Sequence, residues 1–291
     1  MTATSTDRTD MQPDACEFTE DDFAAISRIA KAEYGLHLEP SKKSLIRSRL
    51  RRRIRALGLG GFGAYCRIVE NGDPVEREHF VSALTTNVTH FYREPHHFRH
   101  LEGEVLPPLI DPARAGERIR VWSAGCSTGP EPYSIAASIL KVFPDAARFD
   151  VRILATDIDR AVLRRAEGGR YEAEECKVPD EEHRRRLFAG REDGVATIRP
   201  EVAGLVTFRP LNLNGPWPMS GRFHAIFCRN VAIYFDRPTQ ERLWSRFAEF
   251  LKPGGMLYIG HSERVTGPAT QAFAGCGITT YRHTSAPRPI S

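Results

Sequence analysis

The chain has 291 residues, of which 41% are apolar and 27% are charged, and its formal net charge is +4. These proportions are ordinary for a soluble globular protein with one large domain or two modest ones. No apolar run is long enough to span a bilayer, and the first fifteen residues contain no apolar signal segment. The cysteines form no C-x-x-C pair, which argues against a disulfide framework and a zinc knuckle. We therefore expect a soluble, cytoplasmic protein.

Two kinds of sequence occupy the first part of the chain. Residues 1–17 are polar, and we expect them to form a disordered tail. Residues 18–85 have a helical pattern throughout, which predicts a small all-helical N-terminal domain. Its first helix begins after Thr19, a good N-cap residue that acidic residues follow. Another helix begins near Ser41 and ends at glycines. We expect residues 86–117 to form a linker to the rest of the chain.

Residues 118–291 alternate between short β-rich apolar runs and helical stretches. The runs expected to form strands are residues 118–125, 151–159, 224–230 and 254–263, with an antiparallel edge strand within 275–283. Continuous apolar strands that alternate with helices predict an α/β domain with a doubly wound, mostly parallel sheet. A turn signal followed by a further β-rich run predicts a small β insertion at about residues 171–211.

The stretch WSAGCSTGPEPYSIA, residues 122–136, has the pattern of a strand, a loop of small residues and a helix. Many cofactors with a nucleotide part bind at such a junction. Its spacing matches neither the dinucleotide pattern G-x-G-x-x-G nor the phosphate-binding pattern G-x-x-x-x-G-K-[ST]. Glu131 would stand at the mouth of the site, where a carboxylate repels phosphates and suits a cationic or hydroxyl-rich ligand. The loop therefore favours a ligand without phosphates.

Polar residues also follow the other predicted strands. Asp157 would accept hydrogen bonds from ribose hydroxyls; its alternative role is to cap the next helix, for which Asp159 is the better candidate. Arg229 and Asn230 emerge after an apolar strand, and their alternative role is a surface turn. Residues 261–263 fit a pocket edge and a helix cap equally well.

These features describe a pocket for an adenosine-like ligand that carries positive charge and no phosphates. S-adenosylmethionine is such a ligand, because its sulfonium group is cationic. We therefore expect S-adenosylmethionine as the cofactor, with S-adenosylhomocysteine as its product.

Six motifs in a fixed order carry a family resemblance. They are TTNVTHFYREPHHF at 85–98, the loop at 122–136, ATDID at 155–159, FCRNVAIYFD at 227–236, LKPGG at 251–255 and GHSE at 260–263. Together they resemble the CheR-type chemotaxis receptor methyltransferases of bacteria, over nearly the whole chain from about residue 18. The resemblance implies the class I S-adenosylmethionine methyltransferase fold. It also implies methyl transfer from S-adenosylmethionine to glutamate side chains of chemoreceptor cytoplasmic helices, that is, protein-glutamate O-methyltransferase activity in receptor adaptation.

The resemblance implies roles for the matching positions. Arg93 and Tyr234 are implied near the methyl-transfer end of the pocket. The residues implied to bind the cofactor are Asn87, Thr89, Arg93, Glu131, Asp157, Asn212, Leu213, Arg229 and Asn230. The loop departs from the usual family pattern at Gly125–Cys126 and at Pro130, whereas Glu131 is kept.

The predicted β insertion bears on how the receptor is held. Its segment LFAGREDGVATIRP, residues 187–200, lacks the extra glycine-containing turn of family members that dock on a tail peptide of the receptor. We therefore expect an enzyme that acts without such tethering. Separately, we expect a monomer.

Methyl transfer to a carboxylate does not require a residue that removes a proton from the acceptor. A glutamate side chain has a pKa of about 4.3, so it is already ionised near neutral pH. No general base is needed, and catalysis should come mainly from positioning and dehydrating the two charged groups.

The helix predicted from Ser41 carries eight basic residues and no acid between Ser41 and Arg55. Its apolar face comprises Ile46, Leu50, Ile54 and Leu57, and its basic face comprises Arg47, Arg51, Arg52 and Arg55. One interpretation is a solvated basic face. The mutual repulsion of the charges favours an anionic partner, for which an acidic receptor helix and nucleic acid are both suitable.

Parts of the sequence also bear on other functions. A nucleic-acid methyltransferase is disfavoured, because the chain has no Asn-Pro-Pro-Tyr-like motif and few aromatic residues among its basic ones. A non-catalytic module that senses the cofactor stays open. His96 and His100 are spaced as a metal-binding pair but have no carboxylate or cysteine partner at matching spacing, so we expect no metal. Nucleic acid and membrane insertion are likewise not expected.

Overall fold

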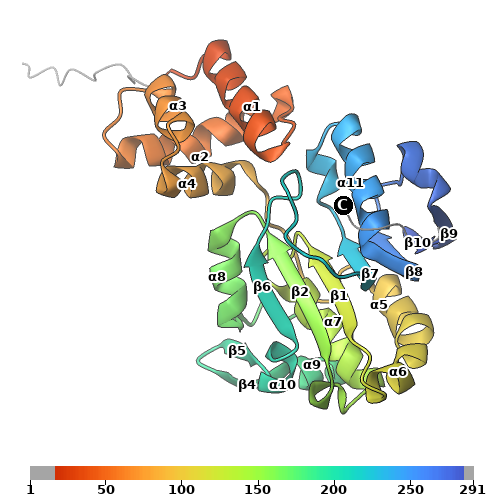
Figure 1. Cartoon of the computed structure of the whole chain (residues 1–291). Helices are drawn as coiled ribbons and strands as arrows, with labels where there is room; N and C mark the ends of the chain where they lie inside the picture. Colours follow the sequence, from red (N-terminus) through yellow and green to blue (C-terminus); the bar gives the residue numbers. More distant parts are fainter. Residues whose placement is uncertain (1–16, 285–291) are drawn as a thin grey trace, which may run out of the picture. The chain divides into compact units, whose positions relative to one another are not determined.

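The computed structural model describes residues 17–284, so the predicted disordered tail lies outside the described residues except for Glu17. The described chain divides into a helical unit, residues 17–32 and 38–84, and a larger α/β unit, residues 33–37 and 85–284. Figure 1 shows the elements of both units. Within residues 17–284, none of the helices is long and apolar enough to cross a membrane.

The helical unit is built on four helices and one 3₁₀ turn. They are α1 (Glu20–Tyr34), α2 (Lys43–Ala56), α3 (Phe62–Glu70), α4 (Pro74–Leu84) and the 3₁₀ turn Pro40–Lys42. The predicted cap of α1 is confirmed, because the Thr19 hydroxyl accepts the Asp22 N–H at 3.1 Å while the Asp22 carboxylate accepts the Thr19 N–H at 3.0 Å. These reciprocal bonds satisfy two backbone donors that the helix itself cannot.

Helix α2 divides into an apolar and a basic side, as its sequence predicts. Ile46, Leu50 and Ile54 are buried in the core of the helical unit. Leu57, which we placed on the apolar face, is instead 37% exposed because α2 ends at Ala56. Of the predicted basic face, Arg47, Arg52 and Arg55 are exposed and Arg51 is half-buried. Arg53 is turned to Glu76 of α4 in an ion pair whose carboxylate side is only 6% exposed.

The α/β unit is centred on a seven-stranded sheet. Its strands are β1 (Ile119–Ala124), β2 (Val151–Asp157), β6 (Val206–Pro210), β7 (Phe223–Cys228), β8 (Leu251–Ile259), β9 (Phe273–Gly277) and β10 (Thr280–His283). They lie in the order β6-β2-β1-β7-β8-β10-β9. The five strands from β6 to β8 are parallel, and β10 and β9 are antiparallel to their neighbours. The predicted doubly wound, mostly parallel sheet with an antiparallel strand near its edge is confirmed.

Helices cover both faces of this sheet. The helices of this unit are α5 (Pro95–His100), α6 (Ile110–Arg114), α7 (Pro130–Val142), α8 (Arg160–Gly168), α9 (Glu181–Leu187), α10 (Pro200–Ala203) and α11 (Arg237–Phe250), with a π-turn at Leu101–Val105 and 3₁₀ turns at Pro107–Leu109, Ala146–Arg148, Ala232–Tyr234 and Gly267–Gln271. Val121 of β1 belongs to the same core as Ile135 of α7. The next residue, Trp122, packs on Phe247 of α11 with ring centroids 5.3 Å apart. Because successive strand residues point to opposite faces, α7 and α11 lie on opposite sides.

Two predicted boundaries are wrong. The small three-stranded sheet has the order β3 (Arg170–Glu172), β5 (Val195–Ile198), β4 (Phe188–Glu192), so the insertion exists. It does not reach residue 211, because β6 pairs in parallel with β2 and completes the main sheet. The segment 86–117 is more than a linker, since Phe91, Tyr92, Phe98 and Leu101 are buried in the main core of the α/β unit.

Candidate functional site

A pocket lies at the carboxyl ends of β1, β2 and β7, the usual position for a ligand in an open parallel sheet. It encloses about 900 Å³ of space up to its open mouth. The ten residues that the sequence predicts for the cofactor and for methyl transfer all line it, namely Asn87, Thr89, Arg93, Glu131, Asp157, Asn212, Leu213, Arg229, Asn230 and Tyr234. The basic residues Arg47, Arg51, Arg52 and Arg55 belong to α2 of the helical unit.

The loop after β1 brings the backbone close to the pocket. The N–H groups of Gly125 and Cys126 both donate to the carbonyl of Thr156, at 2.7 and 2.9 Å, which folds the loop over the end of β2. Gly125 has a φ of 87°, and a Cβ there would lie 2.3 Å from the Val231 side chain. Only glycine therefore permits this loop to close against Val231. Pro130 then begins α7 at a position where its missing N–H is not required.

Asp157 is held by the backbone of this loop. Its carboxylate accepts the Ser127 N–H at 2.8 Å through one oxygen and the Asp159 N–H at 3.0 Å through the other. Each oxygen keeps a second acceptor direction for a ligand hydroxyl. Burial raises the pKa of Asp157 to about 6, while these backbone donors act in the opposite direction. Asp159 is the cap of α8, as expected, because it accepts the Ala161 N–H at 2.8 Å.

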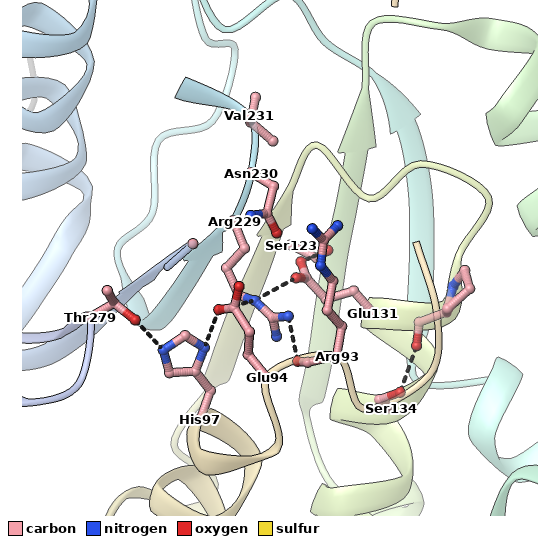
Figure 2. Close-up of polar contacts among 12 residues, drawn as sticks. Arg93, Glu94, His97, Ser123, Glu131, Ser134, Arg229, Asn230, Val231 and Thr279 are labelled. Atoms are coloured by element: carbon pink, nitrogen blue, oxygen red, sulfur yellow. Dashed lines mark hydrogen bonds and ion pairs between the residues drawn. The ribbon is translucent and has the colours of Figure 1, made fainter. Parts of the chain in front are cut away.

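A buried charge cluster forms the wall beneath the β7 end (Figure 2). The Arg229 side chain is 2% exposed, and its Nε lies 3.5 Å from Glu131 Oε2 and 3.7 Å from Glu94 Oε2. Its Nη2 donates to the carbonyl of Arg93. Among residues 17–284, its Nε and Nη1 have no hydrogen-bond partner, so the two carboxylates hold the guanidinium as ion pairs without a hydrogen bond at Nε. Burial lowers the pKa of Arg229 and raises that of Glu131, and the attraction between the two opposes both shifts.

Glu263 shapes the loop that follows β7. Its buried carboxylate accepts the backbone N–H groups of Asn230 at 3.0 Å, Val231 at 2.9 Å and Gly260 at 2.6 Å. Asn230 has a φ of 60°, a left-handed conformation that costs a non-glycine residue energy and that these bonds stabilise. The Oδ1 atom of Asn230 is buried and has no hydrogen-bond partner in the described chain. Residues 261–263 therefore support a pocket wall rather than cap a helix.

The segment Glu33–His37 completes the pocket on another side. Tyr34 and Leu36 line it. The His37 N–H donates to the Tyr234 carbonyl at 2.8 Å, and Leu36 bridges to Phe235 in antiparallel fashion. Sequence reasoning missed this segment, because nothing in its composition indicates that it leaves the helical unit.

Several predicted cofactor residues are also engaged with the protein. The Asn212 amide donates to the Glu33 carbonyl at 2.8 Å and accepts the Asn214 N–H at 2.9 Å. The Asn87 amide donates to the Asp159 carboxylate at 3.0 Å. These two side chains therefore hold the pocket walls together, whatever else they contact.

The tyrosine and arginine expected at the methyl-transfer end are each fixed by one backbone carbonyl. The Tyr234 hydroxyl donates to the Thr86 carbonyl at 3.1 Å, and Arg93 Nη1 donates to the Val88 carbonyl at 3.0 Å. Both bonds tie the side chains to the 85–89 segment, so this segment and the end of β7 shape one mouth.

The predicted histidine pair does not converge. His100 Nδ1 lies 2.9 Å from the Tyr258 hydroxyl. A different set, Glu94, His96 and His97, brings three possible ligand atoms within 4.8 Å of one another. Arg229 Nε already lies 3.7 Å from Glu94 Oε2, so a metal ion there would be placed beside a guanidinium. We therefore treat Glu94 as the partner of Arg229 and assign no metal.

The donor set fits S-adenosylmethionine. Asp157 offers acceptors for ribose hydroxyls, Glu131 offers an acceptor for an ammonium group, and Arg229 Nη1 is an unused donor for a carboxylate. The lining contains two carboxylates and the two guanidinium groups of Arg93 and Arg229, a balance that suits a zwitterion better than a phosphate. S-adenosylmethionine has both a zwitterionic amino-acid end and a ribose.

Comparisons with known proteins agree with the geometry. Two family models match: the S-adenosylmethionine-binding domain of the CheR methyltransferases over residues 87–282, and their all-alpha domain over residues 21–85. A probable chemotaxis protein methyltransferase of Rhizobium etli is 46% identical over 260 residues, which cover 87% of this chain and 96% of that protein. The chemotaxis protein methyltransferase of Escherichia coli is 43% identical over 249 residues, 83% of each chain. The chain belongs to the CheR methyltransferase family, and its cofactor is S-adenosylmethionine.

Proposed function

We propose that this enzyme transfers the methyl group of S-adenosylmethionine to glutamate carboxylates on the cytoplasmic helices of chemoreceptors, and that it works in the cytoplasm. The observation that carries the proposal is the pocket itself, where Glu131, Asp157 and Arg229 offer a match for a phosphate-free adenosyl amino acid. The relatives are named chemotaxis methyltransferases, which supports a receptor as the substrate.

The residues of the pocket have separate tasks in this proposal. Asp157 accepts the ribose hydroxyls, and Glu131 accepts the ammonium group of the cofactor's amino-acid end. Arg229 and Arg93 are the cations available to carboxylates. The cofactor supplies an electrophilic methyl group on its sulfonium sulfur. Tyr234 and Arg93 lie at the mouth and orient the incoming glutamate, which is ionised at neutral pH and needs no base.

The acceptor helix is proposed to dock on the basic face of α2. Arg47, Arg52 and Arg55 of this face are exposed. A receptor segment that presents glutamates is acidic and complements this charge. Nucleic acid is the competing anionic partner, and binding to it would weaken steeply with salt.

We further propose that the enzyme is a monomer that needs no receptor tail peptide. The turn between β4 and β5 contains only Asp193 and Gly194, with φ values of 49° and 83°. Two positive φ values in a two-residue turn are typical of a tight hairpin. The hairpin thus has the short turn that the sequence indicates. Equal methylation of receptors with and without their C-terminal tails would support this part of the proposal.

A labelling experiment tests the activity. The protein is incubated with S-adenosylmethionine labelled in the methyl group and with purified receptor cytoplasmic domains. We expect label on the receptor that alkali releases, because carboxyl methyl esters hydrolyse in base. The Asp157→Ala variant serves as the control for cofactor-dependent transfer. Alkali-stable label, label on added nucleic acid, or cofactor binding without turnover would each contradict the proposal.

A further inference from the structure

Arg229 is shared by two carboxylates that differ in their relation to the pocket. Glu131 lines the pocket, and Glu94 is absent from its lining residues. Both lie within 4 Å of Arg229 Nε, and their side chains are 12% and 11% exposed. The guanidinium also packs on the Phe98 ring, 5.5 Å from its centroid. One of the two carboxylate partners of Arg229, Glu131, therefore faces the pocket, and the other, Glu94, lies outside the pocket lining.

Glu94 is held in place from several sides. Its Oε1 accepts the His261 N–H at 3.2 Å and lies 3.2 Å from His261 Nδ1. Its Oε2 lies 3.5 Å from Nδ1 of His97, a side chain that is fully buried. Glu94 itself has a φ of 56°. A left-handed glutamate before a proline is unfavourable by itself, so these contacts fix a conformation that the local sequence would not choose.

His97 packs beside Glu94 and also contacts the β9–β10 hairpin (Figure 2). Its Nε2 lies 3.2 Å from the Ile278 carbonyl and 3.0 Å from the Thr279 hydroxyl. A carbonyl can only accept, so Nε2 carries the proton, and Nδ1 carries a lone pair that gives the Glu94 carboxylate no hydrogen bond. Burial and the Arg229 charge lower the pKa of His97 to about 3, so the ring is neutral at pH 7. The positive partner of Glu94 is therefore Arg229.

Glu94 changes the balance of charge between Arg229 and Glu131. Arg229 with Glu131 alone would be a neutral pair, and Glu131 would be committed to the guanidinium. With Glu94 added, these three side chains carry one negative charge in excess, which offsets the further positive charge of Arg93, a pocket-lining residue near both Arg229 and Glu131. A ligand ammonium group then meets a carboxylate that an arginine does not fully neutralise.

We propose that Glu94 is a positioning residue. Its ion pair with Arg229, on the side away from the pocket, leaves Glu131 available to the ammonium group of the cofactor. This inference rests on the proposed function, in which the amino-acid end of the cofactor lies at Glu131. It assigns to Glu94 a selective effect on ligands that have that end. It predicts no effect on the adenosyl part, which Asp157 holds.

Two ligands separate these effects. S-adenosylhomocysteine carries the amino-acid end, and 5′-methylthioadenosine lacks it but keeps the ribose and the base. We expect Glu94→Gln to weaken S-adenosylhomocysteine by at least about tenfold, as for loss of a charge-assisted contact in a buried site. Binding of 5′-methylthioadenosine should change less than about twofold, a difference within the usual effect of a distant substitution. In turnover, KM for S-adenosylmethionine should rise more than kcat falls.

Three variants make the result decisive. Glu131→Gln tests the proposed function, because it should show the same selectivity. Glu94→Asp keeps the charge and should recover part of the affinity, and Glu104→Gln changes an exposed glutamate ten residues away and should change neither ligand. If Glu131→Gln is selective and Glu94→Gln is not, the inference is wrong and the proposed function stands. If Glu131→Gln is not selective, the proposed site is wrong. Equal loss of both ligands in Glu94→Gln would show a general structural role and overturn the inference.

Discussion

The Glu263 carboxylate accepts the backbone N–H of Asn230 at 3.0 Å and so fastens the end of β8 to the loop after β7. The same carboxylate accepts the N–H groups of Val231 and Gly260. One buried side chain thus sets the backbone of the loop on which Arg229 and Asn230 reach the pocket. Binding residues keep their geometry only when such supporting hydrogen bonds hold the backbone that carries them.

Replacing this acceptor should destabilise the protein strongly. Glu263→Ala removes the acceptor of four backbone N–H groups, those of Asn230, Val231, Ile233 and Gly260. A buried N–H without a partner costs about 1–3 kcal/mol, and Gly260 contributes one such group while the other three are partly buried, so we expect a loss of about 3 kcal/mol. Denaturant unfolding followed by fluorescence measures the loss. Glu249→Ala, a partly buried glutamate of α11, is the control and should change the free energy of unfolding by less than about 1 kcal/mol. A similar small change for Glu263→Ala would show that water replaces the carboxylate.

The close approach of Gly260 to Asn230 gives a second prediction. A Cβ at Gly260 would lie 2.5 Å from Asn230 Nδ2 and 2.7 Å from its backbone N. Gly260→Ala should therefore displace the loop and weaken S-adenosylhomocysteine binding by more than about tenfold, because ligand contacts tolerate only small shifts. Gly275→Ala is the matched control, since a Cβ there meets nothing within 4 Å. Calorimetry on both variants gives the comparison, and equal affinities would contradict the prediction.

Much of this site follows from local sequence patterns. Glu131, Asp157 and Arg229 each lie just after a strand with a strong apolar pattern, and parallel strands bring their carboxyl ends to one edge. The six ordered motifs indicated the CheR methyltransferase family. The same reasoning placed the end of the β insertion too late, at residue 211. The run at 206–210 has the pattern of a β-strand, but this pattern does not show that the strand pairs with the main sheet.

The supporting residues could not be found in this way. Glu94 contacts Arg229, which is 135 positions away in the chain, and His97 contacts Thr279 on the last hairpin. Tyr34 is the last residue of α1 and Leu36 follows it, yet both belong to the α/β unit and line its pocket. Such contacts depend on tertiary packing between segments that carry no common local signal. The GHSE motif was the one sequence feature that pointed toward Glu263.

The raised pKa of Asp157 predicts a pH dependence of cofactor binding. Its pKa of about 6 lies above the ordinary 3.8, so the ligand-free fold is favoured by protonation at low pH and loses this contribution as the pH rises through about 6. The ionised carboxylate is the form that accepts two ribose hydroxyls. Affinity for 5′-methylthioadenosine should therefore fall about tenfold per pH unit below pH 6.

Asp157→Asn provides the control for this pH dependence. Its amide cannot titrate, so the variant should bind 5′-methylthioadenosine more weakly at pH 8 and with little change between pH 5 and pH 8. Titrations of both proteins at several pH values test this directly. A wild-type affinity that is flat across pH 6 would show that Asp157 is not the ribose acceptor or that it is ionised throughout.

The basic face of α2 gives the last prediction, which separates receptor recognition from cofactor binding. Arg47 and Arg52 are exposed on the helical unit. The double substitution Arg47→Ala with Arg52→Ala should leave S-adenosylhomocysteine affinity within about twofold, because neither side chain lines the pocket. The KM for the receptor should rise about tenfold or more at low salt, since two charge contacts to an acidic helix are lost.

Arg114→Ala with Arg118→Ala removes the same charge from exposed positions before β1 and is the matched control. The difference between the two double variants should shrink as salt increases, because screening weakens exposed charge pairs. Equal KM values for the two at low salt would show that α2 is only a solvated basic face.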